Sequence, residues 1–249
     1  MNRIVEPEWL DELPTDDPRA RWSRCDLRRV NAWMRNHAIM AQALQIAANG
    51  HVPRQIVEFG AGDGNLLLRV ARRISPRWRD MKVTLLDRQK NVTSRTLDSF
   101  ASLGWRAEAL EADVFDWLPT AAGLDIVVAN LFLHHFEDTR LTGLFRAIAG
   151  RARLFVALEP LRAPWPLFCC RLIWAIGCNS VTRHDAIISV RAGFSGNELS
   201  ALWPADVGWQ LTERRTGFFS HLFVAKKINL ACADASALFR TATRRRRPE

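Results

Sequence analysis

The amino-acid sequence predicts an α/β fold, built on a Rossmann-like sheet of five parallel strands and a C-terminal antiparallel hairpin. Two observations carry this prediction. Apolar runs of strand length alternate with amphipathic runs of helical period, a pattern typical of parallel strands joined by right-handed crossovers. Near the C-terminus, two strand-like runs lie close together around Gly217, which indicates a hairpin. Together these runs predict a seven-stranded sheet.

The expected elements follow in order along the chain. Residues 1–20 are acidic and are expected to be irregular, because three prolines (Pro7, Pro14 and Pro18) would interrupt a helix, and a helical cap is expected over 21–48. The five parallel strands are expected near 55–59, 82–86, 105–110, 125–129 and 153–158. The helices between them are expected near 64–75, 91–103 and 138–150. The hairpin strands are expected over 209–216 and 218–226. The chain thus divides into 1–52 with the cap, a sheet domain over 53–229 and a basic tail over 230–249.

An insertion separates the fifth strand from the hairpin, over about 160–204. It begins with an apolar run of helical period that contains Phe168 and Trp174, and it ends in a short helix near 196–202. The chain has ten tryptophans and no tyrosine. Several tryptophans are therefore available to line an apolar pocket.

The turn after the first strand is the strongest indication of a ligand site. Its sequence is Glu58-Phe59-Gly60-Ala61-Gly62-Asp63-Gly64, and an amphipathic helix follows it. Glycine allows positive φ and close approach of a ligand, and the helix N-terminus offers unpaired N–H groups. A dinucleotide site requires G-x-G-x-x-G, with its third glycine where Asn65 stands. Here the third glycine comes one residue early, and Glu58 would repel a pyrophosphate but suits a cationic ligand.

Polar residues also follow the next three strands. Asp87, with Arg88 beside it, ends the second strand at roughly the 20-residue separation that places an acid on ribose hydroxyls in a βαβ unit. Asp113 follows the third strand and Asn130 the fourth. The carboxyl edge of an open α/β sheet is where ligands bind. A helix N-cap or a loop position is the alternative role for Asp87. Asp116 is the alternative to Asp113, although we expect it to cap the short turn that follows it.

These positions resemble the cofactor-binding motifs of the class I S-adenosylmethionine (SAM)-dependent methyltransferases. The glycine turn with Glu58 resembles motif I of that family, whose cofactor carries a sulfonium and an ammonium group. In the family, the residue at Asp113 hydrogen-bonds the adenine amino group and the next residue, Val114, packs on the ring. The resemblance implies that SAM is the cofactor, and that its binding residues are Glu58, Gly60, Ala61, Gly62, Gly64, Asp87, Arg88, Asp113, Val114 and Asn130.

The segment from Asn130 to Phe136 narrows the resemblance to small-molecule enzymes. Its Leu133-His134-His135 sequence resembles methyltransferases related to ubiquinone and menaquinone biosynthesis. Asn130 stands where the amino-methylating branch has the Asn of its Asn-Pro-Pro-Tyr motif, but the prolines and the aromatic ring are absent, which disfavours methylation of nucleic-acid bases. By analogy with the family, the insertion forms a lid over the cleft, where we expect Phe168 and Trp174 to face the acceptor.

We therefore expect methyl transfer to a small apolar acceptor with a phenolic or polyketide-like hydroxyl. Three alternatives are open. The first is methylation of carbon on a quinol-type ring, the second is RNA or protein methylation guided by the basic tail, and the third is a non-catalytic relative that only binds SAM.

A hydroxyl acceptor must lose a proton, and histidine, with a pKa near 6.5, is suited to accept it. Two histidines are candidate bases. His135 follows the fourth strand at the carboxyl edge of the sheet, and His184 lies in the insertion next to Asp185. His134 is expected to pack or to cap instead. Arg191 is a further candidate acceptor contact, with an ordinary ion pair as the alternative.

Composition limits the other classes of function. The formal net charge is +9, and four arginines at 244–247 end the chain, yet no nucleic-acid-binding module accompanies them, so nucleic acid is not an expected partner. No run reaches the roughly 18 apolar residues of a membrane span. The N-terminus has acids and prolines in place of the apolar block of a signal peptide, which favours the cytoplasm. Five cysteines without a CxxC pair argue against disulfides and against a metal site. The oligomeric state is not predicted.

Overall fold

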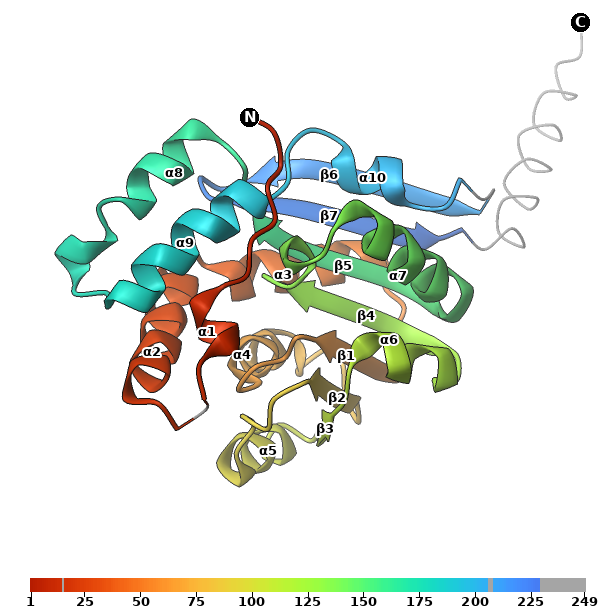
Figure 1. Ribbon diagram of the computed structural model, residues 1–249. Helices are drawn as coiled ribbons and strands as arrows, with labels where there is room; N and C mark the ends of the chain where they lie inside the picture. The colour runs from red at the N-terminus through yellow and green to blue at the C-terminus, as the bar shows by residue number, and fades with distance from the viewer. Residues whose placement is uncertain (15, 206–207, 229–249) are drawn as a thin grey trace, which may run out of the picture.

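The computed structural model describes residues 1–14, 16–205 and 208–228, so the predicted basic tail over 230–249 lies outside the described residues. Its centre is one sheet with the strand order β3-β2-β1-β4-β5-β7-β6 (Figure 1). The strands are β1 Gln55–Phe59, β2 Lys82–Asp87, β3 Arg106–Glu111, β4 Leu124–Asn130, β5 Ala152–Pro160, β6 Trp209–Thr216 and β7 Ser220–Lys227.

The topology confirms the predicted sheet. Strands β1 to β5 are parallel, and β7 pairs antiparallel with both β5 and β6. Chain order along the sheet reverses at β1, which lies between β2 and β4. Phe59 at the end of β1 is in register with Leu86 of β2 and Ala129 of β4, so these three strands finish together. This is the switch point at which open α/β sheets bind ligands.

Helices cover both faces of the sheet (Figure 1). Their apolar side chains pack against the side chains of the strands. One face packs against α3 Asn36–Ala48, α4 Asn65–Ile74 and α5 Ser94–Ala101. The other packs against α6 Val114–Trp117, α7 Asp138–Arg151 and α10 Glu198–Leu202. The central strands β1, β4 and β5 are thereby buried on both sides, which explains their nearly continuous apolar sequence.

The N-terminal region differs from the prediction of an irregular segment over 1–20 and a helical cap over 21–48. Instead of an irregular segment and one helix, it forms α1 Trp9–Glu12, α2 Pro18–Trp33 and then α3. Pro18 does not interrupt a helix, because it is the first residue of α2, where its missing N–H has no partner to lose. Arg35 adopts a left-handed conformation with φ of 57°, which separates α2 from α3.

The insertion lies across the carboxyl ends of the strands. It contains α8 Pro164–Cys170, the 3₁₀ turn η3 Ile173–Ile176 and α9 Ser180–Ala192, followed by α10. Helix α9 packs against α1, α2 and α8, and these segments lie beyond the arrowheads of β4 and β5 in Figure 1. Two further 3₁₀ turns, η1 Leu118–Thr120 and η2 Leu133–His135, flank β4. Across the described residues, the search for a helix with the length and hydropathy of a membrane span finds none.

Candidate active site

A cavity of about 840 Å³ lies at the carboxyl ends of β1, β2 and β4. Its floor is the glycine turn and the strand ends, and its walls come from the first residues of the chain, α2, α8, η3 and α9. This volume is near the upper end of the range for small-molecule sites. The cavity is therefore large enough for two ligands side by side.

The three glycines of the turn have different roles. All have positive φ, at 65° for Gly60, 55° for Gly62 and 73° for Gly64. A Cβ on Gly60 would lie 2.4 Å from the Phe132 ring, and one on Gly64 would lie 2.8 Å from Leu85, so packing requires glycine at both positions. A Cβ on Gly62 would meet nothing within 4 Å. Gly60 and Gly62 line the cavity, whereas Gly64 supports the turn without lining it.

Glu58 presents an unpartnered carboxylate oxygen at the cavity. Its side chain is 2 % exposed, and no group among the described residues bonds to its Oε2 atom. Burial raises the pKa of Glu58 well above its ordinary value, and the nearby carboxylates of Asp63 and Asp87 raise it further. A buried acceptor without a donor is costly unless a ligand supplies one. Glu58 thus fits a cationic or N–H-bearing group in the cavity, as the ammonium of SAM would be.

Asp87 retains acceptor capacity for a ligand. Its Oδ2 accepts a hydrogen bond from the Gly62 N–H at 2.8 Å, and its Oδ1 accepts one from the Gln89 N–H at 2.8 Å. A carboxylate has about four acceptor positions, so two are free for the hydroxyls of a ribose. The exposed Arg88 also lines the cavity.

The remaining cofactor candidates also line the cavity. Ala61 belongs to the glycine turn, and its N–H is bonded to the Leu86 carbonyl. Asp113 is the N-cap of α6, with its Oδ1 atom 2.8 Å from the Phe115 nitrogen, and Val114 is buried beside it. Asn130, at the end of β4, accepts a hydrogen bond at 3.1 Å from the Asn36 side chain of α3.

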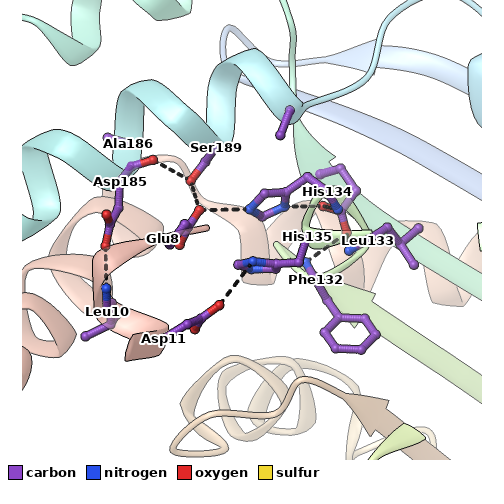
Figure 2. Close-up of polar contacts among 12 residues, drawn as sticks. Glu8, Leu10, Asp11, Phe132, Leu133, His134, His135, Asp185, Ala186 and Ser189 are labelled. Carbon is purple, nitrogen blue, oxygen red and sulfur yellow. Dashed lines mark hydrogen bonds and ion pairs between the residues drawn. The ribbon is translucent and has the colours of Figure 1, made fainter. Parts of the chain in front are cut away.

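His134 is held between two buried carboxylates (Figure 2). Its Nδ1 lies 2.8 Å from Glu159 Oε2, and its Nε2 lies 3.3 Å from Glu8 Oε1. Burial lowers the pKa of His134, but hydrogen bonds to these two glutamates outweigh it and raise the pKa to about 9. The same contact with His134 overcomes the effect of burial on Glu8 and lowers its pKa to about 2. At neutral pH His134 is thus an imidazolium in an ion pair and cannot act as a base.

His135 differs from its neighbour in both contacts and charge. It lines the cavity with its side chain 25 % exposed, and its Nδ1 lies 3.4 Å from Asp11 Oδ2 (Figure 2). Burial and the positive charge of His134 lower the pKa of His135, so its imidazole is neutral at pH 7. With Nδ1 directed at Asp11, Nε2 is the nitrogen available to accept a proton.

His184 is not brought to the cavity. Its ring stacks on Trp9 with centroids 3.7 Å apart, and its Nδ1 bonds to Asp185 at 3.0 Å. Asp185 in turn accepts the N–H groups of Trp9 and Leu10, at 2.9 and 3.0 Å, and so caps α1. These contacts hold α1 against α9 and place His184 outside the lining of the cavity.

The expected roles of three further insertion residues are also not supported. Phe168 and Trp174 do not line the cavity, and their side chains are about half exposed. Arg191, near the end of α9, is exposed and is not a lining residue either. Other residues of α8 and η3 form the inner wall instead: Pro166, Cys169, Cys170 and Ile173.

Two site residues that sequence reasoning missed, Glu8 and Asp11, come from the N-terminal strap, residues 1–12. The strap is fastened by Arg3, whose guanidinium donates to the carbonyls of Ala192 and Phe136 at 2.8 and 2.7 Å. Glu8 also accepts a hydrogen bond from the Ser189 hydroxyl of α9. Because these contacts join residues far apart in the sequence, no local pattern could have revealed them.

The Glu8, His134 and His135 side chains could also hold a metal ion. Each offers one ligand atom, and these atoms lie within 4.8 Å of one another. Cysteine spacing had argued against a metal site, and no sequence pattern places Glu8 near the histidines. In this structure Glu8 and His134 bond to each other.

Comparison with known proteins finds similarity to methyltransferases in sequence. Residues 56–153 match the family model described as a methyltransferase domain. Uncharacterized methyltransferases of Mycobacterium tuberculosis strain H37Rv and of Mycobacterium bovis are 40 % identical to the chain over 85 residues, which are 34 % of this chain and 39 % of each relative. The chain thus matches about two fifths of the length of these relatives.

Solved structures share the fold. The plantazolicin methyltransferase BamL, solved with a triazolic desmethylPZN analog and SAH, superposes with a TM-score of 0.62 at 11 % identity, over 85 % of this chain and 92 % of that one. A putative O-methyltransferase from Nostoc punctiforme gives a TM-score of 0.55 at 15 % identity, over 91 % and 64 %. At identities of 11 and 15 %, the similarity between these structures and the present chain establishes a shared fold. The expected relation to quinone biosynthesis is not confirmed by these comparisons.

Proposed function

We infer that this chain, which contains a methyltransferase domain of the class I fold, is an enzyme that transfers a methyl group from SAM. The observation that carries this inference is the buried, unpartnered Glu58 carboxylate beside the open face of Gly62 and the free acceptor positions of Asp87. These groups suit an ammonium, a closely approaching ligand and a ribose. The residues proposed to hold SAM are Glu58, Gly60, Ala61, Gly62, Asp87, Arg88, Asp113, Val114 and Asn130, with Gly64 supporting the turn.

The acceptor half of the cavity favours a small apolar molecule. Its walls include Trp33, Pro166, Ile173 and Phe219, which offer mainly hydrocarbon and aromatic surface. We therefore propose a phenolic or polyketide-like hydroxyl as the group that is methylated. The structural neighbour from Nostoc punctiforme is named as a putative O-methyltransferase, which supports a hydroxyl acceptor without identifying the molecule.

The chain contributes position, exclusion of water and a proton acceptor. Bound SAM supplies the electrophilic methyl group. With SAM bound, the acceptor oxygen would form the new bond to the methyl carbon as the methyl–sulfur bond breaks, the demethylated cofactor would leave with that electron pair, and the proton of the acceptor hydroxyl would pass to a base on the protein. We propose His135 as the base, because it is neutral, lines the cavity and is oriented by Asp11. His184, the second predicted base, is not adjacent to the cavity and is the weaker proposal.

Calorimetry provides the first test. SAM and its demethylated product should bind, and NAD should not, because Glu58 disfavours a pyrophosphate. Tighter binding of NAD than of SAM would overturn the proposal. Incubation with labelled SAM and a panel of phenols, quinols and polyketides, followed by mass spectrometry, then identifies the acceptor class and separates oxygen from carbon methylation.

Methylation of RNA or protein, guided by the basic tail, makes a different prediction. Removal of residues 241–249 should leave small-molecule methylation unchanged, whereas an enzyme guided to a macromolecule by this tail should lose activity. We also propose that the enzyme works in the cytoplasm. Cys25, Cys169, Cys170 and Cys178, the cysteines that the structure describes, are free thiols, which is compatible with a reducing compartment.

A further inference from the structure

Large apolar side chains are exposed around one side of the cavity. They come from the end of α2, from α8 with η3, and from the turn between β6 and β7. We call this set the apolar rim, and its members are Trp33, Trp165, Phe168, Leu172, Trp174, Ile176 and Phe218. Trp33 and Phe218 are each 68 % exposed. Contiguous apolar surface of this kind is uncommon on proteins without a partner and marks interaction sites.

The three segments of the rim are joined to one another. The Arg29 guanidinium of α2 donates to the Ile176 carbonyl of η3 at 2.9 Å. The Trp33 ring, at the end of α2, lies 5.1 Å from the Phe219 ring of the β6–β7 turn. In Figure 1, α2 and α8 form the left edge of the molecule, beyond the strand ends. The three segments that carry the rim are therefore neighbours in the fold.

The same segments also form the wall of the cavity. Cys170 and Ile173 face inward and line it, while Phe168 and Trp174 from the same stretch are exposed. Trp33 is both exposed and a lining residue. A helical segment that is apolar on both sides normally has both sides covered. Here the cavity accounts for one side only, and no other described residue covers the exposed side chains of the other side.

The charges around the rim indicate which kind of partner would fit it. No aspartate or glutamate occurs in residues 27–35, 160–184 or 214–228, the segments that carry the rim. Arg35, Arg171 and Arg215 are exposed on these segments. Asp26 of α2 is buried beside Arg29, and Asp63, after β1, is paired with Arg28. Tryptophan with arginine and no acid is typical of segments that lie in an anionic membrane interface.

We propose that the apolar rim docks on the surface of an anionic lipid bilayer. The aromatic side chains enter the headgroup region, and the arginines contact the lipid phosphates. A second copy of the chain fits the rim less well, because a symmetric interface would place the same basic segments opposite each other. One consequence rests on the proposed function: the entrance of the cavity faces the bilayer, so an apolar acceptor can pass into it from the lipid. Docking itself requires no methyl transfer.

Vesicle sedimentation of the full chain tests the proposal. The protein should bind vesicles of phosphatidylcholine with phosphatidylglycerol at low salt, and bind much less to phosphatidylcholine alone or at high salt. Trp174→Ser should lower the partition coefficient roughly tenfold. Ile176→Ser should lower it measurably, whereas the matched control Ile46→Ser, an exposed isoleucine at the far end of α3, should not.

Charge reversal gives a second matched pair. Arg171→Glu should weaken binding to the anionic vesicles roughly fivefold, and Arg79→Glu, an exposed arginine outside the rim, should have little effect. The basic residues 244–247 are present in every variant and cannot cause these differences. Thermal denaturation and SAM calorimetry on each variant confirm folding and separate docking from cofactor binding.

Three results would overturn the proposal. The first is absence of binding to anionic vesicles at low salt. The second is equal binding by each variant and its control. The third is a dimer, seen by analytical ultracentrifugation, that Ile176→Ser dissociates in a protein that does not bind vesicles, which would assign the rim to self-association.

Discussion

The two halves of the cavity are built in different ways. In the half proposed to bind the cofactor, Glu58, Gly62 and Asp87 come from one βαβ unit, and Glu58 Oε2 has no hydrogen-bond partner among the described residues. In the half proposed to bind the acceptor, Glu8 and His134 lie 126 positions apart in the sequence, and His134 bonds to both Glu8 and Glu159. The first half thus keeps a carboxylate oxygen open for a ligand. In the second half, the side chains of Glu8, His134 and Glu159 already bond to one another, and the neutral imidazole of His135 lies beside them. Local sequence can therefore specify a binding surface, while the protonation state of a catalytic group depends on long-range packing.

The largest effect is expected at His135 and tests its proposed role as the base. His135→Gln should lower kcat by about 10²–10⁴-fold with SAM affinity little changed, because it removes the proton acceptor. The wild-type rate should fall as pH drops below the lowered pKa of His135, and this limb should vanish in the variant. His184→Gln is the control, since its ring is stacked on Trp9 outside the cavity. Near-normal kcat in both variants would exclude histidine as the base and favour proximity on an ionised acceptor or methylation of carbon.

In the cofactor half, the largest effect is expected at Gly62. Gly62→Val should reduce SAM affinity by roughly a hundredfold or more, because the side chain would occupy the open space that the ligand needs. Gly104→Val is a matched control: Gly104 also has positive φ and open space around it, but it lies outside the cavity. Both variants should lose thermal stability through backbone strain. Equal SAM affinity in the two, measured by calorimetry, would show that Gly62 does not contact the cofactor.

A smaller loss is expected at Asp87. Asp87→Ala should cost about 1.5–3 kcal/mol of SAM affinity, the scale of hydrogen bonds to a charged group. The variant also releases the Gly62 and Gln89 N–H groups, so Asp87→Asn, which keeps an acceptor, should lose less. Isothermal titration with SAM compares the three proteins. Unchanged affinity in Asp87→Ala would remove Asp87 from the cofactor site.

The smallest effect concerns the stability of the acceptor half. The pKa of His134, raised to about 9, contributes stability that is complete below pH 6.5 and is lost as pH rises through 9. The pKa of Glu8, lowered to about 2, contributes stability that is complete above pH 4.5 and is lost as pH falls toward 2. Stability should therefore be greatest between about pH 4.5 and 6.5, and decline by about 1–3 kcal/mol from pH 6.5 to 9.

Urea denaturation at several pH values measures this dependence. In His134→Gln the alkaline decline should flatten, because glutamine has no proton to lose. An equally steep decline in this variant would mean that other groups produce it. Glu159→Gln offers a second comparison, since it leaves His134 with Glu8 as its one carboxylate partner among the contacts described.

The sequence predicted the sheet well because each strand and crossover helix has a local signature. The amphipathic helix after Gly64 and the apolar run before Asp87 are examples, and the observed α4 and β2 agree within a residue or two. The glycine turn is equally local, since its positive φ values depend on the glycines themselves. The period of the apolar residues was sufficient to predict the strands and helices, and the conformational freedom of glycine was sufficient to predict the turn.

The acceptor half was missed for a physical reason. Glu8 contacts a residue 126 positions away, and the two N–H groups of α1 are capped by Asp185 of α9, so α1 exists through tertiary contact. Its four residues are too few to form a stable helix alone. The same reason applies to His184: its proximity in sequence to Asp185 was visible, but the position of its ring on Trp9, outside the lining of the cavity, was not.

The strap places two acids beside the histidines without being part of the sheet. Glu8 contacts His134 and Asp11 contacts His135, yet neither acid belongs to a strand or to the glycine turn. Replacement of residues 1–12 would thus change the charge around both histidines and the shape of one cavity wall, and would leave the glycine turn and the strand ends as they are. The surroundings of the proposed base and the proposed cofactor site can therefore be altered independently of each other.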